Sequence, residues 1–240
     1  MNINEYFTQL HEQVQKSYES ANAARAKGLD PEVKVEIPQA NSLAEKVVGL
    51  ISAIYPQVQD SRIVQRILAL EKQFGSLDPA IALVIAEEVA RERFCKFESH
   101  HQAIEVGVRL AMAYMTLGVV SSPIEGFTQL KINKTCDGED YFAPFYAGPI
   151  RSAGGTEAAF SLVIIDYLRE IFGYSRYDPT DDEVKRGVHE AYFYHERVTN
   201  LQYLPSEEEL EFLLKNIPIQ VKNWGHKVGR PEIDKFKTAI

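Results

Sequence analysis

Cysteine is scarce in this chain of 240 residues, and long apolar runs and an excess of basic residues are missing. The two cysteines, Cys95 and Cys136, form no framework, so reduced thiols in a cytoplasmic protein are the simplest interpretation. The longest apolar stretches, such as Ile81 to Ala86, are too short to span a bilayer. The first residues lack the basic and apolar regions of a secretion signal. We therefore expect a cytoplasmic protein with no membrane partner.

The charge balance is acidic, because 34 aspartates and glutamates outnumber 26 lysines and arginines and give a net charge of −8. Proteins that bind nucleic acid on their own usually carry a basic excess, since neutralising phosphates supplies most of their affinity. The segment 178–211 has ten carboxylates against three basic residues and predicts a solvated surface that repels DNA. The composition argues against an independent DNA-binding domain and allows a subunit that meets DNA over a small patch or mainly meets protein.

Apolar residues at helical spacing fill the first half of the chain. The first predicted helix covers residues 3–27 and ends at Gly28, a natural helix stop. A short extended stretch is predicted over 32–39. Four more helices are expected: from Ser42 to Tyr55, from Asp60 to Gly75, from Asp78 with Pro79 at the first helical position, and from about His101 to Leu117. The first half therefore predicts an all-helical group.

The second half adds β structure. Strands are predicted over 127–133 and 141–146, and the loop between them carries Asp137-Gly138, a good hairpin signal. An amphipathic helix follows and ends at Gly173; capping boxes at Thr180 and Ser206 begin two more helices, before an extended segment over 216–221. We expect a mainly α fold with a small β element, divided into a helical region 1–120, a hairpin and second helical group over 121–221, and an unassigned tail 222–240.

A glycine-rich turn lies between the second predicted strand and the next helix. Residues 143–155 hold three glycines and two prolines, and Arg151 is their only charge. Glycines let backbone N–H groups approach a ligand, and the start of a helix adds partial positive charge. We predict a phosphate site formed by Arg151, Ser152, Gly154, Gly155 and Thr156. The alternative is a plain strand-to-helix turn whose arginine pairs with a carboxylate, because the segment matches neither Gly-x-x-x-x-Gly-Lys-Ser/Thr nor Gly-x-Gly-x-x-Gly.

Three further residues of the predicted hairpin are candidates for contact with DNA. Lys131 and Lys134 lie outside the acidic segment and offer charge for phosphates. Tyr146, at the end of an aromatic-rich strand, offers a ring for stacking on bases. The alternative for the aromatic residues is a place in the core or at an interface, because aromatic side chains chiefly supply buried area.

The sequence predicts no catalytic residues and no metal site. Two-metal chemistry needs closely grouped carboxylates, and the nearest candidate, Asp181-Asp182-Glu183, is better explained as a capping box in the first turn of a helix. Cys95 and Cys136 are isolated, and no Cys-x-x-Cys is present. We therefore expect this chain to hold no cofactor.

Several segments resemble, in the same order, the large subunit of the archaeal family D DNA polymerases. The longest of them runs from Tyr146 to Thr156, and the others are 35–40, 123–126, 194–195, 201–203 and 216–219. The likeness covers Met1 to about Val221 and fades after it. Because the matches are independent and collinear, they identify the chain as the N-terminal portion of such a subunit.

The resemblance implies a role in a two-subunit replicative polymerase. In that family the large subunit synthesises DNA with aspartates that lie far downstream of any residue present here, and a small subunit provides 3′–5′ exonuclease activity. Mg²⁺ is thus expected for the complete polymerase, and this chain is expected to be inactive alone. It would serve subunit assembly and the placement of primer–template DNA in the archaeal cytoplasm, at the nucleoid. Its expected partners are the small subunit and DNA, with self-association left open.

Two other functions are compatible with the residues. The first is a structural interaction module that makes no contact with DNA. The second is a small phosphate-binding enzyme that uses the glycine-rich turn, although the lack of a lysine or a metal cluster counts against it.

Overall fold

The computed structural model describes residues 2–29, 40–59, 61–147, 155–198 and 200–223. They belong to two compact units, Met1–Gln39 and Ala40–Ile240. None of the helices within these ranges combines the length and the apolar character that a membrane span needs.

The described part of the first unit is a helix, α1 (Ile3–Ala26). Asn2 and Glu5 form a capping box at its start, and Gly28 follows its end with a φ of +68°, the left-handed conformation that favours glycine. The helix predicted over 3–27 is therefore confirmed. None of the α1 side chains is buried. The extended stretch predicted over 32–39 lies outside the described residues.

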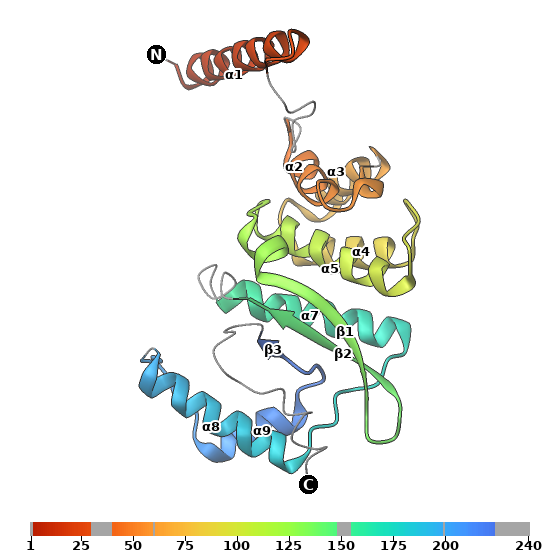
Figure 1. Cartoon of the computed structure of the whole chain (residues 1–240), viewed down its shortest axis with the longest axis vertical. Helices are drawn as coiled ribbons and strands as arrows, with labels where there is room; N and C mark the ends of the chain where they lie inside the picture. Colours follow the sequence, from red (N-terminus) through yellow and green to blue (C-terminus); the bar gives the residue numbers. More distant parts are fainter. Residues whose placement is uncertain (1, 30–39, 60, 148–154, 199, 224–240) are drawn as a thin grey trace. The chain divides into compact units, whose positions relative to one another are not determined.

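The second unit begins with four α-helices, which Figure 1 shows in order along the chain. They are α2 (Leu43–Ser52), α3 (Ser61–Phe74), α4 (Pro79–Ala90) and α5 (His100–Met115), with a 3₁₀ turn, η1 (Pro56–Val58), after α2. The side chains of Ser42, Asp78 and Ser99 each accept a backbone N–H at the start of a helix. The predicted starts at Ser42 and Asp78 are confirmed, whereas the predicted cap at Asp60 lies outside the described residues.

A π-helical turn, η2 (Ser121–Gly126), leads into the predicted hairpin. Strands β1 (Phe127–Lys134) and β2 (Asp140–Tyr146) pair antiparallel, with Phe127 opposite Tyr146 and Lys134 opposite Asp140. Gly138 in the turn has a φ of +87°, which explains the glycine there. The hairpin predicted from the sequence is confirmed.

A third strand joins the hairpin from the far end of the chain. Strand β3 (Lys222–Asn223) pairs in parallel with β2, so that Lys222 lies opposite Phe145, and the sheet order is β1-β2-β3. The sequence placed an extended segment at 216–221 and left 222 onwards unassigned. The observed strand thus lies just beyond the predicted segment. It could not be predicted from the sequence, because two residues that pair in parallel with a distant strand show no local alternation of apolar and polar residues.

Three helices complete the described fold: α7 (Gly155–Phe172), α8 (Asp181–Arg197) and α9 (Glu207–Asn216). Thr180 with Glu183 and Ser206 with Glu209 form the two capping boxes that begin α8 and α9, as predicted. Helices α8 and α9 contact each other, and α7 contacts α4, α5 and β2. The expectation of a mainly α fold with a small β element is confirmed.

One hydrophobic core runs through the second unit. It includes Ile51, Ile85, Leu110, Phe142 and Leu168, so that α2, α4, α5, β2 and α7 all contribute to it. Figure 1 shows α5 and α7 with the hairpin beside them, and these elements are in contact. The core thus includes residues on both sides of position 120.

Candidate nucleic-acid interface

The hairpin presents one face to the core and carries exposed lysines on the rest of its surface. Leu130 and Phe142 are buried, and they pack against the core that α5 and α7 share. Lys131 is exposed, and its Nζ lies 4.9 Å from the centroid of the Phe145 ring. Lys131 and Lys134 are both exposed and therefore accessible to a ligand.

The buried arginine Arg109 on α5 holds the base of the hairpin. Its guanidinium donates hydrogen bonds to the carbonyl oxygens of Pro123 at 2.7 Å, Phe127 at 2.6 Å and Thr128 at 2.7 Å. Its Nη2 also lies 2.8 Å from Glu105 Oε1, one helical turn earlier. A single planar group with several donors therefore fixes the backbone where η2 becomes β1.

Glu105 completes this anchor. Its Oε1 accepts from Arg109 and from the Tyr55 hydroxyl at 3.2 Å, and its Oε2 accepts from the backbone N–H of Leu130 at 2.9 Å. The ring of His101 binds the carbonyl of Leu130, so both backbone groups of that edge residue are satisfied by α5. This network was not predicted from the sequence. An arginine and a glutamate four residues apart, inside the apolar stripe of a helix, were the signal that could have revealed it.

The second predicted lysine is partly neutralised. Lys134 Nζ lies 2.8 Å from Asp140 Oδ1 across the hairpin, and both side chains are largely exposed. An exposed ion pair of this kind contributes little to stability and exchanges readily for another partner. Lys131 and Lys134 are thus both on the surface of β1, and their contact with DNA stays a prediction.

Tyr146 lies in the core. Its ring centroid is 5.9 Å from that of Phe127, and its hydroxyl shares a hydrogen bond of 2.7 Å with Ser161 on α7. Burial raises the pKa of this hydroxyl. The ring has no open face for a base, so we remove Tyr146 from the candidate surface. A core position was the alternative that the sequence left open for this residue.

Most of the predicted glycine-rich turn lies outside the described residues, including Arg151, Ser152 and Gly154. Gly155 is the first residue of α7, and Thr156 is exposed in its first turn. Glu157, also in the first turn, accepts a hydrogen bond of 2.5 Å from the buried hydroxyl of Ser122. A carboxylate therefore already complements the positive end of this helix.

The candidate acidic group on α8 has a structural role. Glu183 Oε2 accepts from the backbone N–H of Thr180 at 3.0 Å, and its Oε1 accepts from the side chain of Gln220 at 3.3 Å. Within the described ranges, no three histidine, cysteine, aspartate or glutamate side chains are arranged to hold a metal ion.

Comparison with known proteins identifies the family. Residues 5–239 match the family described as DNA polymerase II large subunit DP2, N-terminal. The chain belongs to the DNA polymerase II large subunit family. A large subunit from Nanoarchaeum equitans is 44% identical over 232 residues, which are 97% of this chain and 18% of that protein. The resemblance to the family D polymerases is thus confirmed.

Two other relatives show the same pattern of coverage. The DNA polymerase II large subunit of Pyrococcus abyssi is 40% identical over 221 residues, 91% of this chain and 15% of the relative. That of Methanococcoides burtonii is 42% identical over 217 residues, 90% of this chain and 18% of the relative. The chain therefore spans less than a fifth of the length of these large subunits.

Proposed function

We propose that this chain provides an assembly and DNA-positioning part of the polymerase, while the chemistry of nucleotide addition takes place in a longer partner polypeptide or in further parts of the large subunit. The observation that carries the proposal is the match of residues 5–239 to the N-terminal family of a polymerase subunit that is more than five times longer. On this proposal the chain alone neither extends primers nor degrades DNA.

The proposal includes the partners and the cofactor of the complete enzyme. The small subunit would supply 3′–5′ exonuclease activity, and Mg²⁺ would bind to grouped carboxylates of the complete polymerase, where two-metal chemistry requires them. The assembly would act on DNA at the nucleoid, in the cytoplasm. Self-association of this chain remains a further option for its exposed apolar surfaces.

The anchored hairpin supports a role in positioning DNA. Side chains that orient a nucleic acid need a rigid backbone beneath them. The hydrogen bonds of Arg109 and Glu105 on α5 hold the backbone of β1 in place. Lys131 and Lys134 are exposed on that strand. Phosphate contacts of this type fix register and orientation without reading sequence.

The surface of α9 supports a role in assembly. Phe212 and Leu213 are 67% and 55% exposed, and they line a shallow groove with Tyr203 and Pro205. Large apolar side chains gathered on a surface usually mark a protein interface. This groove is the observation that favours the alternative of a structural module without DNA contact.

Charge reversal in the hairpin separates the two functions. In the complete two-subunit polymerase, Lys131→Glu with Lys134→Glu should weaken binding of primer–template DNA. The slope of log affinity against log salt should also become shallower by about 1 for each phosphate that the variant no longer neutralises. Lys185→Glu on the acidic helix α8 makes the same charge change at one position and should alter neither quantity. Equal slopes for both variants would leave the structural module as the better explanation.

A further inference from the structure

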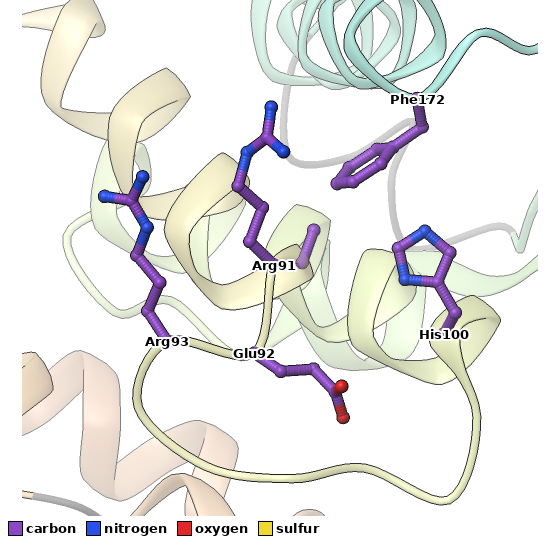
Figure 2. Close-up of a pocket in the computed structure, with 6 residues that line it drawn as sticks. Arg91, Glu92, Arg93, His100 and Phe172 are labelled. Carbon is purple, nitrogen blue, oxygen red and sulfur yellow. The ribbon is translucent and has the colours of Figure 1, made fainter.

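A cleft of about 440 Å³ lies where α4 ends and α5 begins, and Figure 2 shows the residues around it. Arg91 and Arg93 come from the turn after α4, His100 is the first residue of α5, and Phe172 is the last residue of α7. Two parts of the chain that are distant in sequence, residues 90–100 and the end of α7, therefore meet at one opening.

The turn at Glu92 determines where the two arginines point. Glu92 has a φ of +54°, a left-handed conformation that is uncommon for residues other than glycine. Its carboxylate accepts from the backbone N–H of Phe97 at 2.9 Å and from Lys96 at 3.2 Å. Figure 2 shows the side chains of Arg91 and Arg93 running in the same direction, while the Glu92 carboxylate points elsewhere. The conformation belongs to a helix-ending motif, in which the Glu92 N–H donates to Val89 at 2.8 Å and the Arg93 N–H donates to Glu88 at 3.1 Å.

Both guanidinium groups retain donors for a further ligand. Arg91 Nε lies 2.7 Å from a Glu87 oxygen, and Arg93 Nη1 lies 3.0 Å from a Glu88 oxygen. A guanidinium carries five N–H donors, and each of these ion pairs uses one nitrogen. The side chains are 41% and 56% exposed. They are therefore accessible and still able to form bidentate contacts with a phosphate.

Phe172 forms an apolar wall that orients the first arginine. The guanidinium carbon of Arg91 lies 5.3 Å from the centroid of the Phe172 ring, and the His100 ring meets the same ring edge-on at 4.7 Å. Stacking on an aromatic face fixes the plane of a guanidinium and lowers the entropy lost when it binds an anion.

Further charged side chains lie beside the cleft. Arg66 Nε on α3 lies 2.9 Å from Glu88, which it shares with Arg93, and Arg62 donates to the carbonyl of Phe94. The carboxylates of this region are already bonded: Glu87 to Arg91, Glu88 to Arg66 and Arg93, and Glu92 to Lys96, while Glu98 accepts from Gln102. Two neighbouring guanidinium groups with unused donors, Arg91 and Arg93, fit the repeated phosphates of a polyanion better than a single small ion.

We infer that this arginine cleft binds backbone phosphates of DNA. Arg91 and Arg93 are the direct contacts, and Phe172 is a positioning residue for Arg91. The inference rests on the proposed function and adds a second contact surface to the hairpin lysines. It concerns the phosphodiester chain, because the residues present charge and planar donors without a pattern that would read base edges.

The test uses the complete polymerase and primer–template DNA in which single phosphates are replaced by neutral methylphosphonates. In the wild-type protein, replacement at one or two positions should weaken binding. In Arg91→Gln with Arg93→Gln, the same positions should lose their effect, and the salt slope should fall by about 1 to 2. Arg186→Gln on α8, where the arginine faces Glu190 at 3.8 Å, is the matched control and should keep the wild-type pattern.

A milder variant, Arg93→Gln alone, leaves Glu88 with its partner Arg66. This variant should still erase the effect of one methylphosphonate position. If the wild-type pattern of sensitive positions persists in both cleft variants, the inference is overturned. A changed pattern in the cleft variants with an unchanged hairpin variant, Lys131→Glu with Lys134→Glu, would support the cleft and reject the hairpin contact. A free nucleotide or pyrophosphate site would instead show competition by those anions without any position dependence, and would also overturn the inference.

Discussion

At the scale of single residues, the buried pair of Arg109 and Glu105 is the most consequential feature. The two side chains form hydrogen bonds with five other groups: the Tyr55 hydroxyl, the backbone N–H of Leu130, and the carbonyl oxygens of Pro123, Phe127 and Thr128. Buried polar groups of this kind need such partners in place of water. The pair stabilises the fold only while both members are present, because removing one of them leaves the charge of the other buried and uncompensated.

Arg109→Ala should therefore lower the free energy of unfolding by about 3–5 kcal/mol. The exposed arginine Arg186, which faces Glu190 at 3.8 Å, provides the comparison, and Arg186→Ala should cost less than about 1 kcal/mol. Urea unfolding of both variants measures the difference. Similar losses for the two would mean that the buried network does not hold the hairpin.

Tyr114 gives the protein a defined sensitivity to alkali. Burial raises the pKa of Tyr114 to about 12, and the neighbouring Glu71 acts in the same direction. A hydrogen bond from the Leu77 N–H lowers this pKa and offsets part of the increase. An unfolded tyrosine titrates near pH 10. The stability that this tyrosine contributes is thus fully present below about pH 10 and is lost as the pH rises from there to about 12.

In Tyr114→Phe, the Leu77 N–H and Glu71 lose their partner, which lies 2.9 Å from each. The variant should be less stable than wild type at pH 8 by about 1–2 kcal/mol. Above pH 10 the free energy of unfolding of the variant should decline less steeply than that of wild type, because the variant has no Tyr114 hydroxyl to ionise. The two plots of unfolding free energy against pH should therefore converge. Unfolding free energies measured from pH 8 to 12 test this, and parallel curves would contradict the role given to Tyr114.

At the scale of elements, the close crossing of α4 and α5 depends on a glycine. A Cβ at Gly107 would lie 2.6 Å from the carbonyl oxygen of Ala86, which is backbone and cannot rotate away. At Gly187 in α8, a Cβ would meet the end of the Leu214 side chain at 2.7 Å, and that side chain can move. Both changes to alanine gain helix propensity, by about 1 kcal/mol each.

Gly107→Ala should therefore be destabilising by about 1–3 kcal/mol despite the gain in propensity. Gly187→Ala should stay within about 1 kcal/mol of wild type, because the gain offsets a small side-chain shift. Thermal unfolding of the two variants gives the comparison. If Gly107→Ala is as stable as Gly187→Ala, the two helices are not in backbone contact at this crossing.

The elements that the sequence predicted correctly are those with local signals. Ser42, Asp78, Thr180 and Ser206 begin helices because their side chains cap them, and a cap is visible within four residues. The hairpin carries its turn residues between alternating strands. Strand β3 was missed because its pairing with β2 joins residues almost eighty positions apart, which no local pattern encodes.

The candidate site was predictable to a smaller extent. Lys131 and Lys134 are exposed, as their hairpin positions suggested, but Tyr146 is buried because α7 covers its face of the sheet. The arginine cleft could not be found from the sequence, since Phe172 reaches Arg91 only through the packing of α7 against α4.

At the scale of the whole molecule, we propose that an acidic chain contacts DNA through small basic surfaces. The net charge is −8, yet exposed basic side chains gather on the hairpin and around the arginine cleft. Local basic surfaces of this kind can attract and orient a polyanion on a chain whose overall charge is negative.

Steady-state primer extension by the complete polymerase tests the central claim most directly. In a variant that combines Lys131→Glu, Lys134→Glu, Arg91→Gln and Arg93→Gln, the KM for primer–template DNA should rise at least about tenfold, and kcat at saturating DNA should stay within about twofold of wild type. That result would assign this region to holding DNA and not to chemistry. A large fall in kcat at saturating DNA, or an unchanged KM, would contradict the account.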